Sequence, residues 1–150
     1  MEWEYVAKAG EESTYAGSDD LNEVAWHGEN ADGSTREVGQ KIPNAWGIHD
    51  LSGNVWEWVF DGWNRNTYQN RVDGQELNLT DLQTLKSEDE RVARGGSWFG
   101  EGETCRVAYR AGFNLSYQSG NVGFRIVLDC PREEGSIETD LSEDVESNES

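Results

Sequence analysis

The first residues of the chain carry the hydrophobic spacing of a helix. Trp3, Val6 and Ala7 fall at positions i, i+3 and i+4, which places them on one helical face. Gly10 is the residue type that most often follows the end of a helix. We therefore predict a helix over residues 2–9. Because its apolar pattern is complete directly after Met1, we interpret it as the last part of a longer helix, in a domain that is shortened at its N-terminus.

A different period runs over residues 55–60. Here aromatic residues alternate with the others, so that one side of an extended chain carries Trp56, Trp58 and Phe60 and the other carries a carboxylate between two valines. This predicts a strand with both faces occupied, introduced by a turn at Gly53-Asn54.

The remaining segments favour short strands and loops. Strands are predicted for residues 91–98, 105–110 and 122–128. Residues 11–44 are rich in Gly, Asn, Asp, Ser and Thr, which indicates irregular loops pinned by buried aromatic rings. A weak apolar pattern between residues 77 and 85 predicts one short helix. The fold class is α+β, with a small sheet and more loop than regular structure.

The length and composition indicate a single domain with a strong negative charge. A chain of 150 residues is one domain by size, and seven Trp, five Tyr and four Phe supply core mass. The formal net charge of −18 argues against nucleic acid and anionic membranes as partners, because both require clustered Lys and Arg. No apolar run suits a membrane span or a signal peptide, so a cytoplasmic location is the default expectation.

The C-terminal residues hold much of this charge. Residues 131–150 contain eight carboxylates against Arg132 alone, and no aromatic residue follows Phe124. Such a segment buries too little apolar surface to fold, so we predict a folded domain over residues 1–130 and an acidic disordered tail over residues 131–150. Weak cation binding or partner binding by the tail is the alternative.

Cysteine usage is sparse. The chain has two cysteines, Cys105 and Cys130, which excludes a disulfide-dense secreted scaffold. The pair could form one disulfide or remain as two buried free thiols, and the sequence leaves both open.

A candidate recognition segment lies between Arg94-Gly-Gly-Ser-Trp98 and Asn121-Val-Gly-Phe-Arg125. Its aromatic residues offer contact area at low entropy cost, and its small polar residues offer adaptable hydrogen bonds. We predict that residues 99–121 present a ligand surface. In the alternative, the aromatic residues at positions 99, 109 and 113 belong to the core and the rest is solvated loop. The candidate ligand-binding residues are Phe99, Glu101, Glu103, Tyr109, Phe113, Asn114, Ser116, Tyr117, Gln118, Ser119 and Asn121.

Six ordered phrases along residues 2–128 resemble the formylglycine-generating enzyme (sulfatase-modifying factor) family. They are Glu2-Trp3-Glu4-Tyr5, Val38-Gly39, Pro43-Asn44-x-x-Gly47-Ile48-x-Asp50, Gly53-Asn54-Val55-Trp56-Glu57-Trp58, Arg94-Gly95-Gly96-Ser97-Trp98 and Gly123-Phe124-Arg125. The resemblance implies a C-type-lectin-like fold, which is irregular and loop-rich with a small antiparallel sheet. It also implies an N-terminal portion of the family domain that this chain lacks.

The chemistry of the oxidase branch of that family is not expected. Those members bind copper(I) through two cysteines in the loop after Gly-Gly-Ser, and soft thiolates are the ligands that copper(I) requires. Here Gly100 takes the first cysteine position, and the carboxylates of Glu101 and Glu103 are expected to raise the pKa of Cys105. An iron-dependent branch uses three histidines, whereas this chain has His27 and His49, and we interpret His49 as a hydrogen-bonded structural residue. We expect neither copper nor iron.

The resemblance does imply structural calcium. Carried over from the family, its ligands are the Asp50 side chain, the Gly53 and Val55 carbonyls and the Glu57 carboxylate. Hard oxygen ligands of this kind suit Ca²⁺. In the alternative, Glu57 is a buried carboxylate bonded to backbone amides.

A further branch of the family consists of the variable proteins of diversity-generating retroelements, in which the segment from Arg-Gly-Gly-Ser-Trp to Gly-Phe-Arg is diversified to bind ligands. The matching segment here implies a non-catalytic module for a protein or glycan ligand. The alternative is a fragment or accessory half of a formylglycine-generating-type oxidase, and no oligomeric state is predicted.

Four arginines are expected to brace the loops by pairing with carboxylates, and anion binding is the alternative. These arginines are Arg94, Arg106, Arg110 and Arg125.

Overall fold

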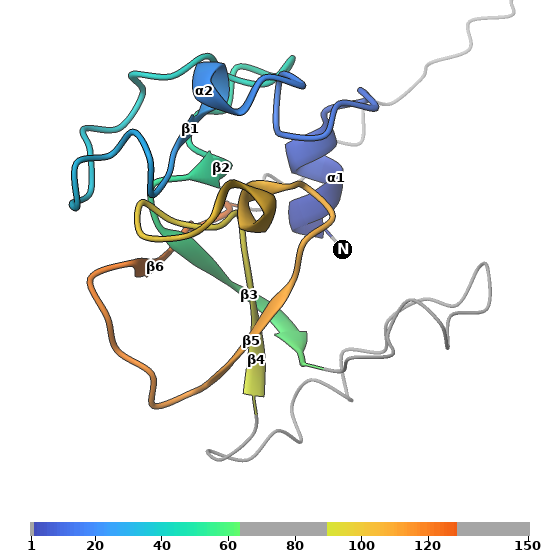
Figure 1. Cartoon of the computed structure of the whole chain (residues 1–150). Coiled ribbons are helices and arrows are strands. Elements are labelled where there is room, and N and C mark those ends of the chain that lie inside the picture. Colours follow the sequence, from blue (N-terminus) through green and yellow to red (C-terminus); the bar gives the residue numbers. More distant parts are fainter. Residues whose placement is uncertain (1, 64–89, 129–150) are drawn as a thin grey trace, which may run out of the picture.

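The computed structural model describes residues 2–63 and 90–128 (Figure 1). Its elements are short, and most of the chain between them is loop. In chain order they are α1 (Glu2–Lys8), α2 (Leu21–Val24), β1 (Ala25–Trp26), β2 (Ser52–Gly53), β3 (Trp56–Gly62), β4 (Glu90–Arg94), the 3-10 helix η1 (Gly102–Cys105), β5 (Ala111–Asn114) and β6 (Val122–Phe124).

A four-stranded sheet in the order β5-β4-β3-β6 forms the centre of the fold. The β3–β4 and β4–β5 pairs are antiparallel, whereas β6 runs parallel to β3. The small sheet is thus confirmed, with two antiparallel pairs and one parallel pair. The parallel pair arises from the connection after β5, which crosses from one edge of the sheet to the other and returns the chain beside β3 (Figure 1). A separate pair of two-residue strands, β1 and β2, is also parallel.

The core lies between α1 and the loops that meet the sheet. Ala7, Leu51 and Val107 are buried in one cluster, against which Trp3 and Val6 of α1 pack. The predicted amphipathic helix is thus confirmed, and its apolar face is the one that meets the core. The helix ends at Lys8, one residue before the predicted end, because Ala9 and Gly10 both have positive φ values, 49° and 85°.

Glycines allow the loops to approach one another closely. Gly96 has φ +73°, and a Cβ atom built on it would lie 2.6 Å from the sulfur of Cys105. Gly53 has φ +80°, and its Cβ would lie 2.3 Å from the Trp26 carbonyl oxygen. Both positions therefore exclude any side chain on steric and conformational grounds. The Gly-Gly-Ser and Gly-Asn phrases are the framework that fixes the loops on the sheet.

Two of the strand predictions change at their C-terminal ends. Strand β4 stops at Arg94 because Gly95 and Gly96 leave the extended region. Strand β6 stops at Phe124, and large hydrophobic residues follow it in the exposed stretch 125–128. The short helix predicted between residues 77 and 85 lies outside the described residues.

The strand predicted over residues 105–110 was wrong. Residues 102–105 form η1, and the next strand begins at Ala111. The cause is Arg94, whose guanidinium donates to the carbonyls of Val107, Ala108 and Tyr109 at 2.9, 3.2 and 2.6 Å. These carbonyls are turned towards one side chain, so they cannot form a strand ladder.

Candidate ligand-recognition surface

Five aromatic side chains meet on one face of the sheet. Phe113 of β5 packs edge-on against Trp56 and Trp58 of β3, with ring centroids 5.7 and 6.0 Å apart. Tyr117 stacks on Phe113 at 4.8 Å with an interplanar angle of 21°, and Tyr109 lies 6.1 Å from Trp56. These offset and edge-to-face arrangements are the favourable geometries for aromatic pairs. We call Trp56, Trp58, Tyr109, Phe113 and Tyr117 the aromatic cluster.

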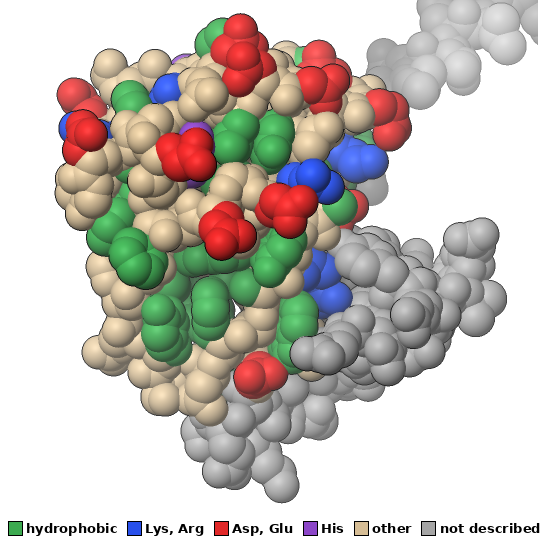
Figure 2. Space-filling view, in the orientation of Figure 1, with side chains coloured by type: hydrophobic (Ala, Val, Ile, Leu, Met, Phe, Trp, Pro, Cys, Tyr) green, Lys and Arg blue, Asp and Glu red, His purple; other side chains and the backbone are tan. Residues whose placement is uncertain are grey.

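The strand register explains why the rings meet. Trp58 lies opposite Ala93 of β4, and Ala93 in turn lies opposite Ala111 of β5. The small side chains of Ala93 on β4 and Ala111 on β5 leave room for the ring of Phe113 to lean across β4 onto the tryptophans. Trp56 is 6% exposed and anchors the cluster, whereas Tyr109 and Tyr117 are about 40% exposed, at 41% and 40%. The cluster therefore has a buried base and an accessible rim, and Figure 2 shows hydrophobic side chains gathered on this face.

The loop over residues 115–121 borders the cluster with polar groups. It is held by a turn in which the Tyr117 amide donates to the Asn114 carbonyl at 2.8 Å, and the Ser116 amide donates to Asn114 Oδ1 at 2.9 Å. Trp98 Nε1 donates to the Gly120 carbonyl at 3.2 Å and ties the loop to the Gly-Gly-Ser-Trp phrase. The end of β5 and this loop therefore present a row of exposed polar residues beside the rings: Asn114, Ser116, Gln118 and Ser119.

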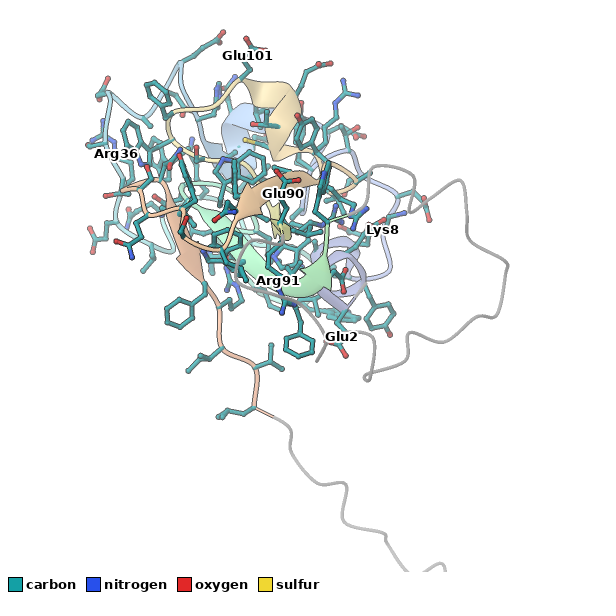
Figure 3. The ribbon with its side chains drawn as sticks, turned by 90° about the horizontal axis from the view of Figure 1, so that it is seen from below. Glu2, Lys8, Arg36, Glu90, Arg91 and Glu101 are labelled. Atoms are coloured by element: carbon teal, nitrogen blue, oxygen red, sulfur yellow. The ribbon has the colours of Figure 1, made fainter. Side chains whose placement is uncertain are left out.

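The predicted recognition residues do not all gather in one place. Tyr109, Phe113 and Tyr117 belong to the cluster, and Phe99 is 74% exposed against Trp98. Glu103 on η1 pairs with Arg106 at 3.2 Å, and Figure 3 places Glu101 at the periphery of the molecule. These two glutamates have no contact with the aromatic cluster among the interactions that the structure describes.

Asn121 lies inside the surface rather than on its rim. Its backbone carbonyl accepts from the Trp56 amide at 2.8 Å, which starts the pairing of β6 with β3. Its side-chain oxygen Oδ1 is buried and has no partner within the described part of the chain. An unsatisfied buried acceptor is costly, so this atom offers a hydrogen-bonding position to a ligand or to water.

Sequence reasoning missed the sheet residues of this surface. Trp56 and Trp58 share one side of the predicted strand, and that alternation was a usable signal. Arg91 and Leu115 line a small cavity beside Trp58 and gave no such signal, because the place of Arg91 depends on the register of β4 against β3 and β5.

Two of the four highlighted arginines brace the framework as predicted. Arg94 is 3% exposed, pairs with Glu4 at 2.5 Å and lies over the ring of Trp3. Arg125 donates through Nε and Nη2 to the Glu57 carboxylate, at 3.1 and 2.7 Å to Oε1. Buried and partly buried charge-assisted bonds of this kind fix the two ends of the recognition segment. Among the described residues, Arg106 forms an exposed pair with Glu103, and Arg110 lies over the ring of Trp63.

Three of the four predicted calcium ligands line one cavity of about 660 Å³, and Gly53 is not among its lining residues. Asp50, Val55 and Glu57 line it, together with Arg125. Asp50 accepts from the Gly39 amide through Oδ2 at 2.7 Å, while its Oδ1 atom is buried without a partner among the described residues. That free oxygen fits a cation. Glu57 fits it less well, because Arg125 and the indole of Trp3 already bind its carboxylate. Side chains, rather than the backbone amides of the alternative interpretation, are thus its partners.

His49 and Cys105 both have structural environments. His49 Nδ1 lies 2.8 Å from the Lys41 carbonyl, as expected for a hydrogen-bonded structural histidine. Cys105 is a buried free thiol, and burial raises its pKa from 9.0 to about 11. The predicted direction is right but the predicted cause was wrong, because desolvation and not the exposed Glu101 and Glu103 produces the shift.

The region of the chain that the structure describes contains no helix long and apolar enough to cross a membrane.

Comparison with known proteins identifies the family. Residues 1–130 match the model of the sulfatase-modifying factor enzyme 1-like domain. The formylglycine-generating enzyme of Streptomyces coelicolor is 33% identical over 90% of this chain and 47% of its own length. Chaperone protein LppX of Paenibacillus barcinonensis is 29% identical over 84% of this chain and 46% of its own. The chain thus spans about half the length of the curated relatives it matches.

Comparison with solved structures supports the same family. Treponema denticola variable protein 1 superimposes with a TM-score of 0.67 at 31% identity, covering 82% of this chain and 43% of that one. The fold is thus C-type-lectin-like and of the kind found in formylglycine-generating enzymes. The chain belongs to the sulfatase-modifying factor family.

Proposed function

We propose that this chain is a non-catalytic recognition module, in which the aromatic cluster and the 115–121 loop bind a ligand. The observation that carries the proposal is the continuous cluster, with a buried tryptophan at its base and exposed tyrosines and amides at its rim. Rigid aromatic anchors beside adaptable polar groups are the usual composition of a binding surface. The similarity to a variable protein supports the same conclusion.

The environment of Cys105 supports binding over oxidase chemistry. A nucleophilic or metal-binding cysteine requires an accessible thiolate, and burial of this thiol favours its protonated form. By the family resemblance Gly100 stands at the first cysteine position, and a Cβ added there would already lie 2.8 Å from the Thr104 hydroxyl. No feature of the described residues therefore favours the alternative of an oxidase half.

The ligand is a protein or a glycan in this proposal. Aromatic faces pack against apolar side chains and against the C–H faces of sugars, and amide side chains hydrogen-bond to either class. Similarity to a protein named as a chaperone is consistent with a polypeptide.

Calcium bound beside Asp50 is proposed as a structural brace. The buried, unpartnered Oδ1 of Asp50 supports it, and the Gly53 and Val55 carbonyls with Glu57 would complete the ligand set. When bound, the ion would neutralise the negative charge of the Asp50 and Glu57 carboxylates near the start of β3. Arg125 partly does this already, since it binds Glu57 directly.

The recognition role is tested with two exposed tyrosines as a matched pair. The full chain is used to select ligands from a random peptide library and from a glycan array, and affinities are measured by calorimetry. Tyr117→Ala is expected to weaken binding at least 10-fold. Tyr5→Ala is the control, because Tyr5 is 68% exposed and packs on Trp46 instead. Failure to select any ligand, or equal affinity of the Tyr117 variant and the unmodified chain, would contradict the proposal.

A further inference from the structure

A second, smaller cavity opens at one end of the recognition surface. Its volume is about 360 Å³, and its lining residues are Trp58, Val59, Phe60, Arg91 and Leu115. It is continuous with the aromatic cluster through Trp58, on which Phe113 packs. Four of the five lining residues are hydrophobic, so the guanidinium of Arg91 is the charged group of an otherwise apolar pocket.

Arg91 is held in place but leaves one side of its guanidinium unused. It lies on β4, between Gly62 of β3 and Phe113 of β5 in the sheet register. Nη1 donates to the Phe60 carbonyl, and the guanidinium carbon lies 5.5 Å from the Phe60 ring centroid. Nε is buried and has no hydrogen-bond partner within the described residues. Figure 3 shows this residue near the centre of the face seen from below.

No carboxylate neutralises this arginine among the residues that the structure describes. The described ion pairs of the other arginines are with Asp32, Glu4, Glu103 and Glu57. A half-buried, unpaired cation is unexpected in a chain with a net charge of −18. An unsatisfied buried N–H is also costly. An arriving acceptor would relieve both costs.

The unused edge defines the chemistry of the acceptor. Nε–H and Nη2–H of a guanidinium point in parallel and match the two oxygens of a carboxylate. We propose that this pocket binds the C-terminal carboxylate of a polypeptide that ends in an apolar residue. The carboxylate pairs with the Nε and Nη2 edge of Arg91, and the last side chain packs against Trp58, Phe60 and Leu115. The proposal deepens the recognition function above and rests on it.

The apolar walls favour this ligand over an acidic sugar. A terminal residue carries its side chain on the carbon next to the carboxylate, and here apolar walls stand directly beside the guanidinium. The hydroxyls of a sugar would find few partners on Val59, Phe60 and Leu115. Leu115, which is 42% exposed, lines the cavity on the side of the recognition loop and would pack against the terminal side chain.

The test compares two peptides that differ only in the terminal group. N-acetyl-Gly-Leu with a free carboxylate and its C-terminal amide are titrated into the ¹⁵N-labelled full chain, followed by NMR. The free acid is expected to shift the Arg91 Nε–H resonance and the amides of residues 58–60 and 115. The amide is expected to bind at least 10-fold more weakly.

Two variants at the same position and one matched control complete the test. Arg91→Gln should weaken binding of the free acid at least 10-fold. Arg91→Lys should retain an intermediate affinity, because lysine keeps the positive charge but lacks the two parallel N–H donors of the guanidinium. Arg106→Gln is the control, since Arg106 is exposed and pairs with Glu103 outside the pocket. The amide spectrum of each variant reports whether it is folded.

The outcomes separate this inference from the recognition function. Equal affinity for acid and amide, with both lost in Tyr117→Ala, would overturn the carboxylate pocket and leave the recognition surface standing. Binding of neither peptide would overturn the pocket as well, whereas ligand selection on the Tyr117 variant decides the broader proposal.

Discussion

At the scale of single residues, Gly96 shows how the framework restricts the sequence. Gly96→Ala combines a positive φ with a Cβ placed 2.6 Å from the Cys105 sulfur and 2.9 Å from its Cα. Backbone atoms on η1 cannot move aside as a flexible side chain can, so we expect a loss of about 2–4 kcal/mol in the free energy of unfolding. Urea denaturation measures it.

Gly120→Ala is the matched control for that change. No atom lies within 4 Å of a Cβ at Gly120, so the expected effect is within about 0.5 kcal/mol. Equal effects of the two substitutions would show that the Gly-Gly-Ser phrase is not a rigid support.

The Cys105 thiol predicts a pH dependence. Its pKa rises from 9.0 to about 11 on burial, so the folded chain keeps a proton that the unfolded chain releases. The stabilising contribution is therefore complete below pH 9 and is lost as the pH rises towards 11, by an amount on the order of 2 kcal/mol. Denaturation at pH 8, 9, 10 and 11 measures the decline.

Cys105→Ala separates this thiol from the lysines and tyrosines that titrate over the same range. The variant should start less stable, because it leaves a cavity, but should lose less stability between pH 9 and 11. Parallel pH curves for the two proteins would contradict a buried, protonated thiol.

At the scale of elements, strand β5 contributes to stability and the loop after it contributes to binding. Phe113 touches the rings of Trp56, Trp58 and Tyr117, so Phe113→Ala is expected to cost about 2–3 kcal/mol. Phe99→Ala removes a ring from a residue that is 74% exposed and should cost less than about 1 kcal/mol. Equal costs would mean that the aromatic cluster does not anchor β5.

The elements also show what the sequence could reveal. The alternation from Trp56 to Phe60 predicted β3 and the side of it that carries the rings, because a strand has a simple local period. The segment 105–110 misled the same reasoning, since the guanidinium of Arg94 turns three of its carbonyls away from a ladder. Arg91 was missed for a related reason: its environment is made by residues of three strands.

At the scale of the whole molecule, the loops are held by a few long-range bonds rather than by long elements. Glu57 connects α1 through Trp3 to the segment after β6 through Arg125. If calcium adds to this connection, excess Ca²⁺ should raise the unfolding temperature of the full chain relative to a chelator. At about 100 times its Kd, the ion would add about 2.7 kcal/mol.

Asp50→Ala should abolish that calcium response, because it removes the carboxylate with the unpartnered oxygen. Glu23→Ala, which removes an exposed carboxylate far along the chain from this site, should retain it. The same unfolding temperature with calcium and with chelator would show that Arg125 alone neutralises Glu57.

The measurement that tests the central claim most directly is randomisation of the exposed rim. Positions 99, 116, 117, 118 and 119 are varied together in the full chain, the variants are displayed, and new ligands are selected. The account predicts many variants that unfold near the temperature of the parent and bind different ligands, since all five residues are exposed. Variants that mostly fail to fold, or that fold but never acquire a new ligand, would contradict a recognition surface on a fixed frame.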